Sequence, residues 1–280
     1  MRIFPISDIH ANFMDTSKYS DISMFNMEHM KKVFKPLGTG ADTVLLACGD
    51  VGERLQGVVW CERMLQVFPN LEICYCPGNH EFYGSNLDLL LYDMKIMSDT
   101  NPRLHILDGL YNCRAVIKDN INRPVLVVVG GTLWTDFNNQ SPEIMNLAQR
   151  RMNDYNQIKS GRDGKNINAN RILNLHYETR KNIFHNIENT DKSIPLVCMS
   201  HHTPYIGIPT EGLHYCYYVD MSENFNNLSR VPQYWFSGHT HKSTVKKEVF
   251  PAGEITFISN QVGYPNELST GFTTECFVEV

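Results

Sequence analysis

The stretch LEICYCPGNHE, residues 71–81, carries an apolar run straight into polar residues. Its first part, residues 71–76, is mostly apolar on both faces of an extended chain, which is typical of a strand covered on both sides. A proline and a glycine then turn the chain, and the polar residues that follow are Asn79, His80 and Glu81. The stretch predicts a buried strand that presents ligand-binding side chains at its carboxyl end.

The same pattern recurs four more times along the chain. Apolar runs at residues 2–7, 43–48, 195–200 and 233–237 are followed by Asp8 and His10, by Asp50, by His201 and His202, and by His239 and His241, respectively. Further apolar runs lie at residues 125–130 and 255–259, and helical patterns lie at residues 21–37, 53–68, 142–158 and near 168–188. Strands that alternate with helices predict an α/β fold with much parallel sheet.

The composition is that of a globular protein of 280 residues, of which 42% are hydrophobic and 20% charged. The net charge of -5 provides no basic field, which disfavours nucleic acid as a partner, and no apolar run reaches the length of a membrane span. The N-terminus lacks the apolar core of a signal peptide, so we expect a cytoplasmic protein whose eight cysteines stay reduced.

The chain shows neither an internal repeat nor a low-complexity linker. The simplest organisation is one domain over residues 1–280 with a helical excursion at about 137–193. Within it, residues 159–170, KSGRDGKNINAN, are predicted to form a surface loop. A second irregular stretch is expected at residues 205–230.

The side chains after the five runs are oxygen and nitrogen donors without cysteine. Such a set suits Mn, Fe, Zn, Co or Ni, and Mn is the ion that we expect first. Seven donors are too many for one ion, whereas two ions that share a bridging carboxylate would use all of them. Two such cations ~3.5–4 Å apart can bind a phosphoryl oxygen and generate a hydroxide nucleophile. The donors are Asp8, His10, Asp50, Asn79, one of the pair His201 and His202, His239 and His241.

These motifs, in this order, resemble those of the calcineurin-like metallophosphoesterase family. They are Asp8-x-His10, Gly49-Asp50, Gly78-Asn79-His80-Glu81, His201 and Gly238-His239-x-His241. The segments GTLWTDF (131–137), MNDYNQI (152–158) and NQVGYPNE near the end resemble a bacterial and phage branch of the family. The resemblance implies a two-sheet β-sandwich flanked by helices, with two metal ions at the carboxyl ends of the strands.

The resemblance also implies a role for each motif residue. One ion would take Asp8, His10 and His241, the other would take Asn79, His201 and His239, and Asp50 would bridge them. The choice of His201 over His202 follows the family pattern. His80 would reach the substrate and protonate or stabilise the leaving oxygen.

Two further residues are expected to bind substrate, each with an alternative. Arg54, in the segment Gly49-Asp50-Val-Gly-Glu53-Arg54, resembles the phosphate-binding arginine of the serine/threonine phosphatases, but Glu53 departs from their pattern and a surface salt bridge is the alternative. For His202, the alternatives to a substrate contact are support of a ligand and packing in a turn. For Trp134, Asp136 and Tyr155, a structural role is favoured over lining the substrate cleft.

The function predicted is that of a binuclear metal-dependent phosphoesterase, which hydrolyses a phosphate ester by attack of a metal-bound hydroxide. A phosphatase is favoured, and a phosphodiesterase acting on cyclic nucleotides or nucleic acid is the alternative. A catalytically retired module that binds another protein is disfavoured because the ligand set and His80 are both present.

Overall fold

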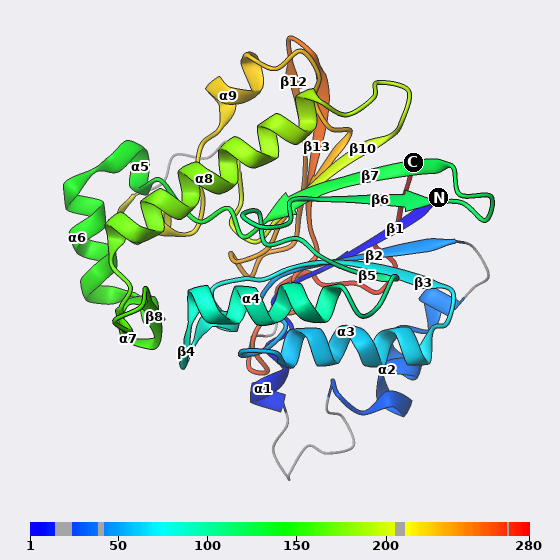
Figure 1. The fold of residues 1–280 in the computed structure, drawn as a ribbon, viewed down its shortest axis with the longest axis horizontal. Helices are drawn as coiled ribbons and strands as arrows, with labels where there is room; N and C mark the ends of the chain where they lie inside the picture. Colours follow the sequence, from blue (N-terminus) through cyan, green and yellow to red (C-terminus); the bar gives the residue numbers. More distant parts are fainter. Residues whose placement is uncertain (15–23, 39–41, 205–210, 268) are drawn as a thin grey trace.

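Figure 1 shows the computed structural model, which describes residues 1–14, 24–38, 42–204, 211–267 and 269–280. Two β-sheets pack face to face in the middle of the molecule, and helices cover their outer faces. The predicted α/β fold, a two-sheet β-sandwich flanked by helices, is confirmed. No helix in the described part of the chain has the length and apolar character needed to cross a membrane.

The first sheet has the strand order β14-β1-β2-β3-β5. Its inner strands are parallel, and β14 is antiparallel at one edge. The strands are β1 (Arg2–Ile6), β2 (Thr43–Cys48), β3 (Leu71–Cys76), β5 (Leu104–Ile106) and β14 (Val278–Glu279). The helices on its outer face, in the lower half of Figure 1, are α2 (Met27–Val33), α3 (Gln56–Val67) and α4 (Leu87–Ser98).

The second sheet has the order β12-β13-β11-β10-β7-β6, with parallel strands in the middle and antiparallel ones at both edges. The strands are β6 (Arg114–Lys118), β7 (Pro124–Gly131), β10 (Leu196–Ser200), β11 (Tyr234–Phe236), β12 (Thr244–Phe250) and β13 (Gly253–Ser259). The helices on its outer face are α8 (Ala169–Glu188) and α9 (Ser222–Asn226).

Alternation along the strands explains why the runs are apolar on both faces. In β2, Val44, Leu46 and Cys48 pack between the two sheets, whereas Leu45 and Ala47 pack against the helices. A strand that is covered on both sides must be apolar at every position. The carboxyl end is the place where such a strand presents polar side chains.

The segment between β7 and β10 contains α5 (Phe137–Gln140), α6 (Pro142–Arg151), α7 (Asp154–Gln157), β8 (Ile158–Ser160), β9 (Lys165–Asn166) and α8. With β4 (Ser85–Asn86), β8 and β9 form a small third sheet. This segment corresponds to the predicted excursion at 137–193, and the assignment of residues 1–280 to one domain stays a prediction.

Several local expectations differ from the structure. The helix predicted over 142–158 is two helices, because the chain leaves helical geometry at Met152 (ψ 140°). Part of the loop predicted at 159–170 is the hairpin β8–β9, in which β8 pairs with β9 on one side and with β4 on the other. The irregular stretch at 205–230 includes a 3-10 helix, Gly212–Cys216, and α9, whereas residues 205–210 lie outside the described chain. The helix expected at 21–37 begins at Met27 after its Asn26 cap, and residues 21–23 lie outside the described chain.

Candidate metal centre

The five polar stretches of the sequence come together at the carboxyl ends of β1, β2, β3, β10 and β11. Their side chains form four overlapping groups, and within each group the candidate ligand atoms lie within 4.8 Å of one another. The groups are Asp8, His10 and His241; His10, Asp50 and His80; Asp8, Asp50 and His201; and His201, His202 and His239.

Asp8, His10 and His241 form what we call the Asp8 group. His10 Nε2 lies 3.0 Å from His241 Nε2, and Asp8 Oδ1 lies 3.4 Å from that same nitrogen. Asp8 and His10 are fully buried. One carboxylate and two imidazole nitrogens therefore converge on a single point.

Asn79, His201 and His239 form the Asn79 group. His201 Nε2 lies 3.0 Å from His239 Nδ1 and 3.1 Å from Asn79 Oδ1. The other nitrogen of His201, Nδ1, donates to the carbonyl oxygen of Cys48 at 2.9 Å. This hydrogen bond keeps a proton on Nδ1, so Nε2 is the nitrogen that could coordinate a cation in this group.

Asp50 lies between the two groups. Its Oδ2 is 4.0 Å from His10 Nε2 in the Asp8 group and 3.4 Å from His201 Nε2 in the Asn79 group. Its Oδ1 accepts a hydrogen bond from the backbone N–H of His80 at 2.9 Å. One carboxylate thus faces both sets of donors.

The buried carboxylates of the cluster need a compensating positive charge. Burial raises the pKa of Asp50, but the imidazoles of His201 and His80 lower it well below its usual range. Burial in turn lowers the pKa of His201, yet the carboxylates of Asp50 and Asp8 raise it to about 10. Without a cation, a proton on a buried imidazole offsets the buried carboxylates. Divalent cations offset them directly, and the donor set is one that such ions accept, so these residues fit metal ions.

The backbone is strained where it presents these side chains. Left-handed φ angles are found at Asp8 (54°), His10 (47°), Asp50 (52°), His239 (71°) and His241 (51°). Non-glycine residues rarely adopt this region, and each instance costs on the order of 1–3 kcal/mol. Such strain gathers at functional sites, where the surrounding fold holds it in place.

Glycine is required beside Asp50. A Cβ atom on Gly78 would lie 2.2 Å from Asp50 Oδ1, and one on Gly49, whose φ is 85°, would lie 2.5 Å from His201 Nδ1. Any larger residue at either position would displace a side chain of the cluster.

Three buttressing carboxylates were not assigned a role from the sequence. Glu267 Oε2 lies 2.6 Å from His241 Nδ1, and Asp154 Oδ1 accepts from Asn79 Nδ2 at 2.9 Å. Fully buried Glu81 accepts from the backbone N–H groups of Asp50, Val51, Gly52 and Gly78, and so ties the loops after β2 and β3 together. All three lie within quoted motif segments, but only the fold reveals which groups they contact.

His80 lies at the mouth of the cluster. Its ring stacks on Tyr83 with centroids 4.3 Å apart, and its Nε2 lies 3.3 Å from Tyr264 Oη and 4.0 Å from Asp50 Oδ2. It lines a cleft of about 850 Å³ together with Asp50, Asn79, His239 and His241. His80 thus belongs to neither the Asp8 group nor the Asn79 group, although its ring lies with His10 and Asp50 in one of the four sets of converging ligand atoms.

Arg54 and His202 do not line this cleft. Arg54 is exposed, and its backbone N–H donates to the carbonyl oxygen of Glu81. Glu53 accepts from Asn12 Nδ2 at 3.2 Å, and within the described residues it makes no hydrogen bond to His80. His202 is buried, with its ring 4.3 Å from that of His239 and 5.5 Å from that of Trp134. The substrate-binding roles of Arg54 and His202 stay predictions.

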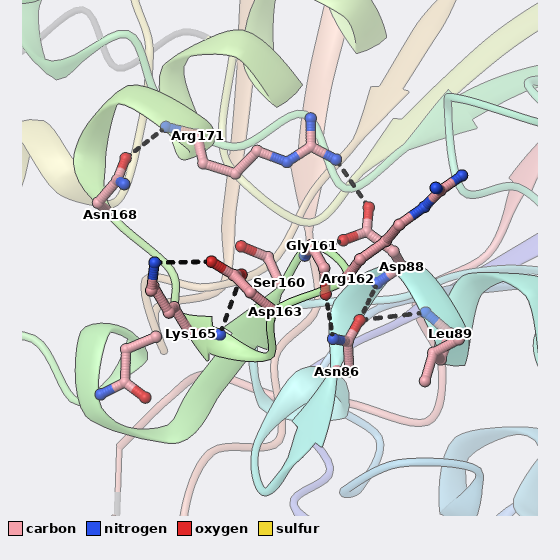
Figure 2. A pocket seen from close by; sticks show the side chains of 11 residues that line it. Asn86, Asp88, Leu89, Ser160, Gly161, Arg162, Asp163, Lys165, Asn168 and Arg171 are labelled. Atoms are coloured by element: carbon pink, nitrogen blue, oxygen red, sulfur yellow. Dashed lines mark hydrogen bonds and ion pairs between the residues drawn. The ribbon is translucent and has the colours of Figure 1, made fainter.

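A second hollow, of about 790 Å³, lies beside the small third sheet and shares no lining residue with the cleft. Figure 2 shows its two ion pairs, Arg171 with Asp88 and Lys165 with Asp163. It contains no histidine and none of the residues predicted from the motifs. The chemistry of the motifs therefore belongs to the cleft.

Comparisons with known proteins agree with this geometry. The family model described as calcineurin-like phosphoesterase matches residues 1–243. An uncharacterized protein of Acanthamoeba polyphaga mimivirus is 26% identical over 226 residues, which are 75% of this chain and 74% of the relative. The crystal structure of a phosphopantetheinyl hydrolase from Mycobacterium tuberculosis shares the fold, with a TM-score of 0.61 and 15% identity over 94% of this chain and 89% of that one. The chain belongs to the calcineurin-like phosphoesterase family and is a metal-dependent phosphoric ester hydrolase.

Proposed function

We propose that this chain is a phosphatase that uses two divalent metal ions to hydrolyse a phosphomonoester. The observation that carries the proposal is the position of Asp50 between the Asp8 group and the Asn79 group. One ion would be held by each group, with Asp50 as the shared ligand. When bound, the ions would supply Lewis acidity for the phosphoryl oxygens and an activated water for attack on phosphorus, and Mn is the ion that we expect first.

In this proposal, His80 would donate a proton to the leaving group. It borders the cleft beside Asp50 without belonging to either three-residue group, and it is partly exposed, with 13% of its side chain accessible. Its neighbours Tyr83 and Tyr264 hold the imidazole from two sides. A protonated imidazole there can hydrogen-bond to the departing oxygen of an ester that is bound in the cleft.

The charges in the cleft favour a monoester over a diester. Arg151 and Lys242 line the cleft, and neither forms an ion pair within the described chain. A phosphomonoester carries a charge of roughly -1.5 to -2 at neutral pH, whereas a diester carries a single negative charge. Two cations in the lining of the cleft complement the more highly charged ester.

A substrate panel tests the proposal. The metal-free protein is assayed with added Mn²⁺ on phosphomonoesters, cyclic and linear phosphodiesters, pyrophosphate and phosphopeptides. We expect kcat/KM to be highest for a monoester, chelation to abolish turnover, and Mn²⁺ to restore it. Turnover confined to diesters would establish the phosphodiesterase alternative instead. Failure to bind two ions, together with no turnover, would point to a retired interaction module.

A further inference from the structure

A buried carboxylate from the segment between β7 and β10 reaches into the centre. Asp154 begins α7, is 4% exposed and lies 75 residues from Asn79 in the sequence. It forms no ion pair with a lysine, arginine or histidine of the described chain. Its Oδ1 instead accepts from Asn79 Nδ2 at 2.9 Å and from Tyr83 Oη at 2.7 Å. Burying a charge without a cationic partner costs free energy, so a carboxylate at this position is expected to have a function.

That function can be inferred from the two ends of the Asn79 carboxamide, its NH₂ group and its oxygen. An amide has an NH₂ that donates and an oxygen that accepts, whereas an ionised carboxylate only accepts. Asp154 therefore selects the orientation in which Asn79 Nδ2 faces α7. The oxygen then faces the centre, where Oδ1 lies 3.1 Å from His201 Nε2. A neutral amide in place of Asp154 could pair with either end of Asn79 and would not make this selection.

Tyr83 strengthens the arrangement. Its hydroxyl donates to the same Asp154 oxygen, and its own oxygen lies 3.3 Å from Asn79 Nδ2. The ring of Tyr83 stacks on His80. Asp154 does not occur in any of the four groups of converging ligand atoms, so its contact with the centre runs through Asn79.

We propose that Asp154 is a positioning residue which holds the Asn79 carboxamide with its oxygen toward the metal ion of the Asn79 group. The inference rests on the proposed two-metal function. It implies that Asp154, the first residue of α7, sets the affinity of one of the two metal positions. The loss of a residue that orients a metal ligand typically weakens metal binding ~10–100-fold.

The affinity of each metal position can be measured directly with Mn²⁺, because free Mn²⁺ has a strong electron paramagnetic resonance signal that is lost on binding. We expect the parent to bind two ions in two resolvable steps. Asp154→Leu should weaken one step ~10–100-fold and leave the other within twofold. Asp154→Asn, which keeps the volume and one acceptor, should weaken the same step less, but at least threefold. Thermal unfolding of each metal-free variant establishes that it is folded.

Double variants separate positioning from a merely structural role. Asn79→Ala removes the ligand that Asp154 is proposed to hold, so Asp154→Leu should add no further loss in the Asn79→Ala background. Glu267→Ala is the matched control at the other position, because Glu267 contacts His241 in the Asp8 group. In the Glu267→Ala background, the effect of Asp154→Leu should be fully additive.

The outcomes distinguish the inference from the function on which it rests. A parent protein that binds fewer than two Mn²⁺ ions would overturn both. If the parent binds two ions, two results for Asp154→Leu would overturn the role of Asp154 alone. The variant would bind both ions at parental affinity, or it would bind both more weakly by equal factors. Should Asp154→Leu fail to fold, Asp154→Asn decides, and parental affinity in that variant overturns the inference.

Discussion

Glu267 holds His241 by the nitrogen that does not face Asp8. Glu267 Oε2 lies 2.6 Å from His241 Nδ1, while His241 Nε2 lies 3.4 Å from Asp8 Oδ1. Because a carboxylate only accepts, the imidazole proton is placed on Nδ1 and the lone pair on Nε2 faces the Asp8 group. Asp154 does the equivalent for Asn79. Each proposed metal position therefore has one ligand that is oriented by a carboxylate from outside the strand ends.

Replacing Asp50 by Asn should weaken the binding of both ions. The change keeps the size of the side chain but removes the charge that faces both groups, so the mutual repulsion of two cations is less compensated. Elemental analysis after gel filtration should find fewer than two ions per chain, whereas the parent retains two. Two tightly held ions in Asp50→Asn would refute the bridging assignment.

The sequence predicted the strand ends because their signal is local. A buried apolar run and the polar residues after it are adjacent in the chain, and the parallel arrangement brings Asp8, Asp50 and Asn79 to one edge. Asp154 and Glu267 gave no such signal, since each is a single acidic residue whose partner is distant in sequence. Their identification required the positions of α7 and of the segment after β13.

The short strands of the third sheet also lacked a local sequence signal. Strands β4, β8 and β9 have two or three residues each and no apolar alternation, so their pairing depends on tertiary contacts. For Arg54 the local pattern predicts a phosphate contact that stays a prediction. Its side chain is exposed and does not line the cleft.

Replacing Glu81 by Gln should destabilise the fold. Each carboxylate oxygen of Glu81 accepts from two backbone N–H groups, at 2.7–3.4 Å. The NH₂ of Gln cannot accept, so one pair of buried donors would lose its partner at a cost of about 1–3 kcal/mol. Urea unfolding of metal-free protein measures the change. Glu72→Gln is the control on β3, the strand that precedes Glu81, because Glu72 is only half-buried and pairs with His105 near the surface. Equal stabilities for the two variants would contradict the role given to Glu81.

Buried His176 should make stability fall as the pH drops from 6.5 to 4. Burial lowers its pKa to about 4, while Nδ1 donates to the carbonyl oxygen of Leu133 at 2.9 Å. Above pH 6.5 the imidazole is neutral in both states. Between pH 6.5 and 4 the unfolded chain binds a proton that the folded chain excludes, which favours unfolding by up to ~1.4 kcal/mol per pH unit. Below pH 4 both states bind the proton and the loss ends.

The variant His176→Gln, which keeps a donor for Leu133, tests this assignment. Its free energy of unfolding should decline less steeply than that of the parent between pH 6.5 and 4, because one titrating group is gone. Comparing parent and variant removes the contribution of the other histidines. Parallel curves for the two proteins would show that His176 is not the group responsible.

The replacement of His80 by Ala should separate chemistry from metal binding. His80 lies outside the two three-residue groups, so the His80→Ala variant should bind two Mn²⁺ ions with affinity close to that of the parent. Turnover should nevertheless fall, because a positioned general acid contributes ~10²–10⁴-fold to the rate. Loss of one ion in this variant would instead make His80 a ligand and overturn its assignment as the acid.

The size of the rate loss should depend on the leaving group. 4-Nitrophenyl phosphate releases a stable phenolate that needs little protonation, whereas an alkyl phosphate releases a basic alkoxide that needs much more. If His80 supplies that proton, the deficit of His80→Ala will be larger for the alkyl ester, provided that chemistry limits the rate for both. Single-turnover measurements on the two esters meet that condition. Equal deficits would mean that His80, held between Tyr83 and Tyr264, orients the phosphoryl group and leaves the departing oxygen to take its proton from water.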